Sequence, residues 1–270
     1  MCKSRLILIV LGLFFISLFC ISGFVSAEEL KIADILKRGY LKVAICGTVH
    51  NYCLKTPDGK IEGFDNDITR LLAKAMFEDE NKFEYLVVTG AGRIPSIVTR
   101  KADVCLGCTN ITPDRAMKVA FTIPYHNAGQ HAVVRRDAKV ERLEDLNREG
   151  IKIAISGAPF YAKLVDTYFP KATKVTFEIL TDALMAVRAG RAQAMLNEMY
   201  AAKAIAKGDK SLMVIEGFVG SPMNIGMLVN LEDREWPTFL NTFISELTTG
   251  YYLNEYKAMH IKWFGVEPKL

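Results

Sequence analysis

The pattern of apolar and polar residues predicts alternating strands and helices in the first half of the chain. Short apolar runs typical of buried strands occur at residues 41–46, 82–88 and 102–107. Between them, apolar residues recur at helical spacing over residues 67–76 and 94–99. An order of strand, helix, strand, helix, strand predicts a parallel α/β sheet.

The same order begins again in the second half of the chain. Further strands are expected at residues 132–135, 151–155, 175–179, 193–196 and 224–229, with helices between and after them. No linker rich in Pro, Gly or Ser separates the two halves. We therefore expect two α/β lobes with a cleft between them, which is a preferred position for a ligand.

The first 27 residues have the pattern of a secretory signal peptide. Basic residues precede a long apolar run, and the small residues Ser26 and Ala27 end the segment before two glutamates. A retained membrane anchor is the alternative, because the apolar run is nearly long enough to cross a bilayer. A lipid anchor on Cys20 is rejected, because bulky Phe19 stands where a lipoprotein signal has a small residue. We predict cleavage after Ala27 and release into the periplasm.

Composition limits the class of function. Half of the 270 residues are hydrophobic and 24% are charged, which excludes a disordered chain. The formal net charge of +4 is small and partly due to the basic residues of the signal segment. We therefore expect no nucleic-acid partner.

Four cysteines lie beyond the signal segment, namely Cys46, Cys53, Cys105 and Cys108. If residues 104–108 are extended, Cys105 and Cys108 lie about 10 Å apart, too far for a disulfide. We therefore expect pairing between the segments around Cys46/Cys53 and Cys105/Cys108 rather than within them. Free buried thiols are one alternative. A redox or zinc site is another, although no helix starts directly at the Cys105-x-x-Cys108 motif and the Cys46–Cys53 spacing is poor for zinc.

The sequence predicts neither a cofactor nor a metal site. Gly90 and Gly92 between a strand and a helix resemble the opening of a dinucleotide-binding fingerprint, but Pro95 stands at the third glycine position. The four histidines show no spacing that is typical of metal ligands.

Two segments resemble a known family. The first is residues 59–68 (GKIEGFDNDI), and the second is residues 111–125, which begin with ITPDR and end with FTIPY. In this order the segments resemble the amino-acid-type periplasmic solute-binding proteins, which are the receptors of ABC importers. The resemblance covers about residues 35–265.

The resemblance implies the type II periplasmic-binding-protein fold, in which two hinge strands join two α/β lobes. Lobe one would comprise residues 28–130 and 225–270, and lobe two residues 131–224. The two crossings between the lobes would act as hinges that let the lobes close on a ligand.

The resemblance also implies residues for the ligand site. Arg115 matches the arginine that holds the ligand α-carboxylate, and its planar guanidinium can pair two oxygens at once. The Asn110 side chain and the backbone of Thr112 would complete that shell. The alternative for Arg115 is an ordinary surface salt bridge.

Glu198 stands where the family usually has an aspartate that holds the ligand ammonium. The alternative is a carboxylate that only stabilises a helix start. Tyr52 matches an aromatic platform, with an ordinary half-buried tyrosine as its alternative. At Ala158 and Asn110 the sequence departs from the hydroxyl residues of the family, so a ligand other than a standard α-amino acid is also considered.

The resemblance implies a binding protein, not an enzyme. It would capture a small polar ligand, first of all an amino acid, and deliver it as a monomer to an ABC permease in the inner membrane. One alternative is an enzyme on the same scaffold, similar to cyclohexadienyl dehydratases, with Glu198 as general acid. A further alternative is a sensory module that reports ligand to a membrane partner.

Overall fold

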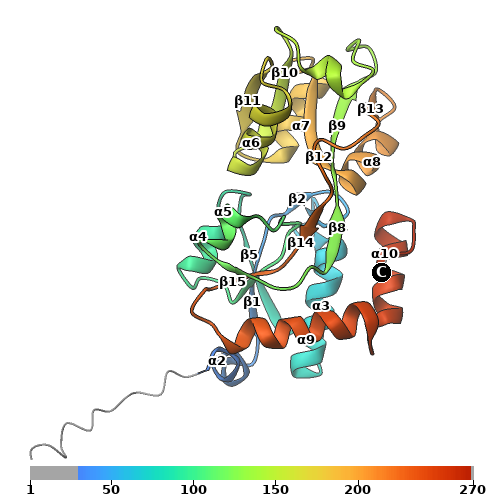
Figure 1. Ribbon diagram of the computed structural model, residues 1–270. Helices are drawn as coiled ribbons and strands as arrows, with labels where there is room; N and C mark the ends of the chain where they lie inside the picture. Colours follow the sequence, from blue (N-terminus) through green and yellow to red (C-terminus); the bar gives the residue numbers. More distant parts are fainter. Residues whose placement is uncertain (1–29, 269–270) are drawn as a thin grey trace, which may run out of the picture. The chain divides into compact units, whose positions relative to one another are not determined.

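The computed structural model describes residues 30–268 (Figure 1). The predicted signal peptide, residues 1–27, lies outside the described residues. Within residues 30–268, none of the helices has the length and apolar character needed to cross a membrane.

The first sheet is built on the parallel strands that the pattern predicts. Its strands follow the order β5-β1-β6-β15-β7 and comprise β1 (Leu41–Ile45), β5 (Phe83–Val87), β6 (Val104–Cys105), β7 (Ala120–Phe121) and β15 (Leu228–Val229). Strand β1 runs parallel to β5 and β6, whereas β15 is antiparallel to both of its neighbours. Strand β15 comes from the C-terminal part of the chain, so this sheet is completed by a segment distant in sequence.

Besides the short helix α5 (Pro113–Ala116), five helices of the described part of the chain accompany the first sheet. They are α2 (Lys31–Arg38), α3 (Phe64–Phe77), α4 (Arg93–Val98), α9 (Glu235–Thr249) and α10 (Leu253–Phe264). Helix α3 begins three residues before the range that the pattern predicts. Its N-cap is Gly63, whose φ of 137° and close approach to Tyr52 leave no room for a side chain: a Cβ there would lie 2.2 Å from the Tyr52 carbonyl oxygen.

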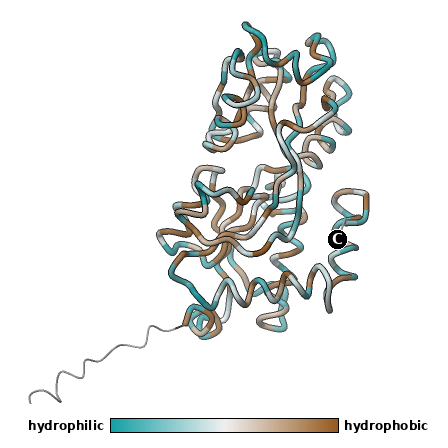
Figure 2. The backbone as a smooth tube through the Cα atoms, in the orientation of Figure 1, coloured by the Kyte–Doolittle hydropathy of each residue, from teal (hydrophilic) through white to brown (hydrophobic). Residues whose placement is uncertain are grey.

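The second sheet repeats the pattern. Its strands follow the order β11-β10-β12-β9-β13 and comprise β9 (Gln130–Arg135), β10 (Lys152–Ser156), β11 (Thr173–Phe177), β12 (Ala194–Glu198) and β13 (Leu212–Val214). The accompanying helices are η1 (Leu143–Leu146), α6 (Pro159–Tyr168), α7 (Leu180–Arg188) and α8 (Met199–Gly208). Apolar residues concentrate on the strands, as Figure 2 shows, and the central strands β10 and β12 are buried almost throughout.

Two short strands connect the sheets. β8 (His126–Ala128) leads from β7 toward β9, and β14 (Met223–Ile225) leads from β13 back toward β15. They pair antiparallel, with Met223 opposite Ala128 and Ile225 opposite His126 (Figure 1). The chain thus has two α/β lobes joined by two strands. The lobe boundaries at residues 130/131 and 224/225 stay a prediction.

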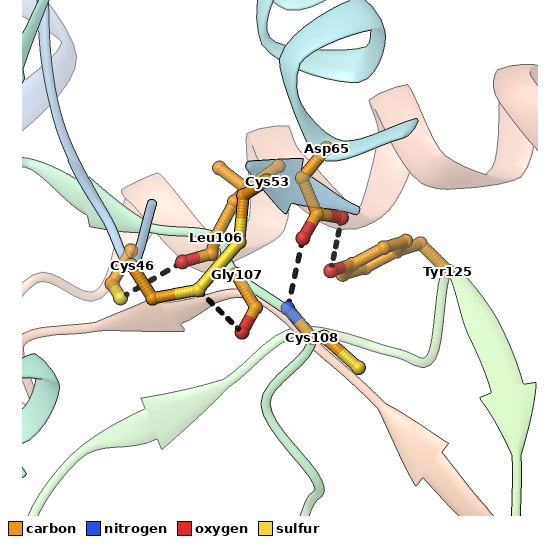
Figure 3. The surroundings of a disulfide bond; sticks show 8 residues. Cys46, Cys53, Asp65, Leu106, Gly107, Cys108 and Tyr125 are labelled. Atoms are coloured by element: carbon orange, nitrogen blue, oxygen red, sulfur yellow. Dashed lines mark hydrogen bonds between the residues drawn. A yellow bond between two sulfur atoms is a disulfide. The ribbon is translucent and has the colours of Figure 1, made fainter. Parts of the chain in front are cut away.

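The disulfide differs from the prediction. Cys46 pairs with Cys53, with their Cα atoms 6.3 Å apart (Figure 3). Cys105 and Cys108 are buried free thiols. The predicted pairing between the two segments is therefore wrong. The physical reason is the small sheet of β2 (Thr48–Val49), β3 (Cys53–Lys55) and β4 (Ile61–Glu62), in which the β2–β3 hairpin folds Cys53 back toward Cys46.

Candidate functional site

A cavity is lined by loops and helix starts of both lobes. Its lining includes Thr48, Val49, Gly90, Arg93, Cys108, Asn110 and Arg115 from the first lobe, and Ser156, Ala158, Phe160, Tyr161, Glu178, Ile179 and Leu180 from the second. Most of these residues follow the carboxyl ends of strands β1, β5, β6, β10 and β11. This is the edge at which open α/β sheets bind ligands.

Arg115, the residue predicted to hold a carboxylate, lines this cavity. It belongs to the short helix α5 (Pro113–Ala116), and its Nη1 donates a hydrogen bond to the Asn110 carbonyl oxygen at 2.7 Å. Its guanidinium carbon lies 5.2 Å from the ring centre of Phe160, which belongs to the other lobe. Burial, and then the charge of Arg93, lower the pKa of Arg115 to about 10, so it stays charged at neutral pH. Among residues 30–268, no carboxylate forms an ion pair with it, unlike an ordinary surface arginine.

Of three other residues predicted for the carboxylate end of the site, two line the cavity together with Arg115. Asn110 and Ala158 line the cavity, and both are buried. Thr112 is the residue before α5 and does not line the cavity. The side-chain oxygens of Asn110 and Thr112 are buried without a hydrogen-bond partner in the described part of the chain, so both remain able to bond to a ligand or water.

Glu198 and Tyr52 form a second group that lies outside the cavity lining. Glu198 ends β12 and is 1% exposed. Its Oε2 accepts hydrogen bonds from the backbone N–H groups of Tyr200 at 2.9 Å and Ala201 at 3.1 Å. This oxygen therefore acts as the helix-start acceptor that the alternative reading describes. Its Oε1 has no hydrogen-bond partner within residues 30–268.

The electrostatics place Tyr52 and Cys108 close to Glu198. Burial raises the pKa of Glu198 to about 8, against the lowering effect of the two backbone hydrogen bonds. Burial, followed by the charge of Glu198, raises the pKa of both the Tyr52 hydroxyl and the Cys108 thiol. Cys108 also lines the cavity, so the charge of Glu198 acts on a residue of the cavity wall. Tyr52 is fully buried rather than half-buried.

Sequence reasoning missed Arg93 as a site residue. It is the first residue of α4, is 9% exposed and lines the cavity, and its Nε is buried without a hydrogen-bond partner in the part of the chain described. The signal was a charged residue directly after Gly90-Ala91-Gly92, in a loop that leaves a strand end. Ser156, at the end of β10 and buried in the cavity wall, was also missed.

Two α/β lobes joined by two antiparallel strands, with a polar cavity lined from both, define the class of two-lobe binding proteins. Within that class, residues 41–266 match the model of the bacterial extracellular solute-binding proteins, family 3. The chain belongs to this family. The expected family and fold are thus confirmed.

Similar proteins agree with this assignment. The glutamine-binding protein of Geobacillus stearothermophilus is 33% identical over 203 residues, which cover 74% of this chain and 77% of that protein. A mutant of ArgBP from T. maritima is 30% identical with a TM-score of 0.79, over 88% of this chain and all of that one. An ancestral amino-acid-binding protein, described as a precursor of cyclohexadienyl dehydratase, is 30% identical with a TM-score of 0.78, over 86% and 99% of the two chains.

Proposed function

We propose that this protein is a periplasmic receptor that binds an amino acid in the cavity between its lobes and delivers it to an ABC permease. The observation that carries the proposal is the unpaired guanidinium of Arg115, which faces a cavity lined from both lobes. A carboxylate ligand would supply the missing negative charge. Family membership and relatives named for glutamine and arginine binding support the same class of ligand.

In this proposal, Arg115 and Asn110 bind the α-carboxylate. Glu198 and Tyr52, which do not line the cavity in this structure, receive the ammonium. A positive charge next to Glu198 stabilises its carboxylate form, so the bound ammonium lowers the raised pKa of this group. Ala158 offers only backbone groups where the family has a hydroxyl, and Thr112 supports the loop. Binding of one ligand by both lobes would favour closure about β8 and β14.

Export to the periplasm and a permease partner are also part of the proposed function. The pattern of residues 1–27 supports export, and we propose that cleavage after Ala27 leaves a monomer in the periplasm. The protein would then bind and release its ligand without making or breaking a covalent bond. Two proteins named as ABC transporter binding proteins, those for glutamine and arginine, are among its relatives, which supports a permease as partner.

A thermal-shift screen with the standard amino acids tests this function. A ligand present at 100 times its Kd should add roughly 2.7 kcal/mol to the free energy of unfolding, which is a shift of several degrees. Arg115→Met should remove the shift, whereas Arg191→Met, at an exposed position outside the cavity, should retain it. If no amino acid stabilises the protein, or if Arg115→Met keeps the full shift, the proposed function is wrong.

One observation favours a second candidate, an enzyme similar to cyclohexadienyl dehydratases. With a pKa of about 8, Glu198 holds its proton at neutral pH, as a general acid must. Prephenate added to the purified protein would be consumed if this candidate is correct, and Glu198→Gln would abolish the turnover. Stabilisation by an amino acid without prephenate turnover would favour the receptor.

A further inference from the structure

Two arginines, not one, bring positive charge to the cavity. Arg93 and Arg115 both line it, and the charge of Arg93 contributes to the lowered pKa of Arg115, so the two guanidinium groups interact. Arg93 is 9% exposed and Arg115 is half-buried. Within residues 30–268, neither forms an ion pair with a carboxylate.

The nearby carboxyl groups compensate this charge only in part. The Asp65 carboxyl is buried. Burial has the largest effect on its pKa and raises it to about 7, whereas the charge of Arg93 lowers this pKa to a smaller extent. Its two oxygens accept hydrogen bonds from the Tyr125 hydroxyl and the Cys108 backbone N–H, each at 2.8 Å (Figure 3). Glu178 lines the cavity but is exposed, so water screens its charge.

Charge balance therefore discriminates between ligands. A buried charge without a partner is costly, and removing one partner of a buried pair typically costs several kcal/mol. A neutral amino acid brings one carboxylate and one ammonium, so it can compensate Arg115 but leaves Arg93 unpaired. An amino acid with a second carboxylate compensates both, and its ammonium remains available for Glu198.

We infer that the cavity is built for an acidic amino acid, with one carboxylate on Arg115 and the other on Arg93. This inference rests on the proposed receptor function and deepens it. Ser156 and Asn110, both buried in the cavity wall, add neutral hydrogen-bonding groups that suit carboxylate oxygens.

The test compares ligands that differ by one charge at nearly the same shape. Isothermal titration calorimetry would measure Kd for L-glutamate against L-glutamine and for L-aspartate against L-asparagine. One acid should bind at least about 30-fold more tightly than its amide, as expected for a buried charge pair. Succinate and glutarate, which lack the ammonium, should bind more weakly than the preferred acid.

Arg93→Met supplies the matched variant, and Arg191→Met is its control at an exposed position. Arg93→Met should reduce the preference for the acid over the amide to within a few fold, chiefly by weakening the acid. Arg191→Met should leave the preference unchanged. The comparison of ligands on the unmodified protein needs no variant, so the inference is tested even if Arg93→Met does not fold.

The outcomes separate this inference from the proposed function. If neutral amino acids bind as tightly as the acidic ones or more tightly, the inference is overturned and the receptor function stands. If the acid preference persists in Arg93→Met, the assignment of Arg93 is overturned. If succinate or glutarate binds best, the ligand is a dicarboxylate without an ammonium and the amino-acid assignment fails. If neither amino acids nor dicarboxylates bind, the proposed function itself fails.

Discussion

Replacing Glu198 with glutamine is expected to change how the free energy of unfolding depends on pH. Burial raises the pKa of Glu198 from its ordinary 4.5 to about 8 in the folded protein. Between these two values the unfolded chain has released its proton while the folded protein retains it. The folded state binds more protons there, so the free energy of unfolding falls as pH rises from 4.5 to 8.

The size of the effect follows from the same shift. Each pKa unit corresponds to about 1.4 kcal/mol, so Glu198 should destabilise the ligand-free protein by about 3 kcal/mol at pH 7 relative to pH 4.5. Glutamine has nearly the same shape, and its carbonyl oxygen can still accept the hydrogen bonds from the backbone of Tyr200 and Ala201. The variant therefore removes the titration and keeps the helix cap.

Urea unfolding at pH 5 and pH 7, followed by tryptophan fluorescence, measures the difference. Trp236 is fully buried and reports the transition. Glu198→Gln should be close to the unmodified protein at pH 5 and more stable by about 2–3 kcal/mol at pH 7. The other titrating groups contribute equally to the free energy of unfolding of the variant and of the unmodified protein, so their contributions cancel in the comparison. Glu216→Gln, at an exposed carboxylate, should give the same small difference at both values. An equal difference for Glu198→Gln at both pH values would refute a raised pKa.

Three further predictions follow from the structure. Arg115→Met should leave the ligand-free free energy of unfolding within about 1 kcal/mol, because it removes an uncompensated cation together with one hydrogen bond; urea unfolding measures this, and a larger loss would show a structural role. Binding of an amino acid at pH 7 should release up to one proton from Glu198, measured by calorimetry in two buffers of different ionisation enthalpy; no release would argue against contact with the ammonium. Cys46→Ser with Cys53→Ser should cost about 2 kcal/mol, because the disulfide closes a loop with a sequence separation of 7; thermal unfolding with and without reductant measures this, and an unchanged midpoint would contradict the pairing.

The periodicity of the sequence determined the lobes to a large extent. The strand around residues 41–46 and the helix around residues 67–76 depend on local patterns of apolar residues, which bury one face whatever lies elsewhere in the chain. Both appear in the structure, with ends displaced by a few residues at Ile45 and Phe64. The ends differ because caps depend on tertiary contacts, such as the approach of Gly63 to the Tyr52 carbonyl.

Motifs of contiguous residues also predicted part of the candidate site. Arg115, Asn110 and Ala158 were predicted from the family resemblance, and all three line the cavity. For Arg115 a local reason exists as well, because a loop that leaves a buried strand end places its side chains at the ligand edge of the sheet. The two motifs that carry the family resemblance are each contiguous, so they required no knowledge of the fold.

Only the tertiary structure decided what depends on segments that meet in space. The spacing of the cysteines in the sequence does not predict that a hairpin brings Cys53 next to Cys46. Nor does the sequence predict that Arg93 and Arg115 lie close together in one cavity. The protonation of Glu198 likewise depends on burial by both lobes, and no residue type or spacing encodes that. Local patterns follow from the periodicity of one segment, whereas pairing, charge balance and pKa values depend on how distant segments exclude water from one another.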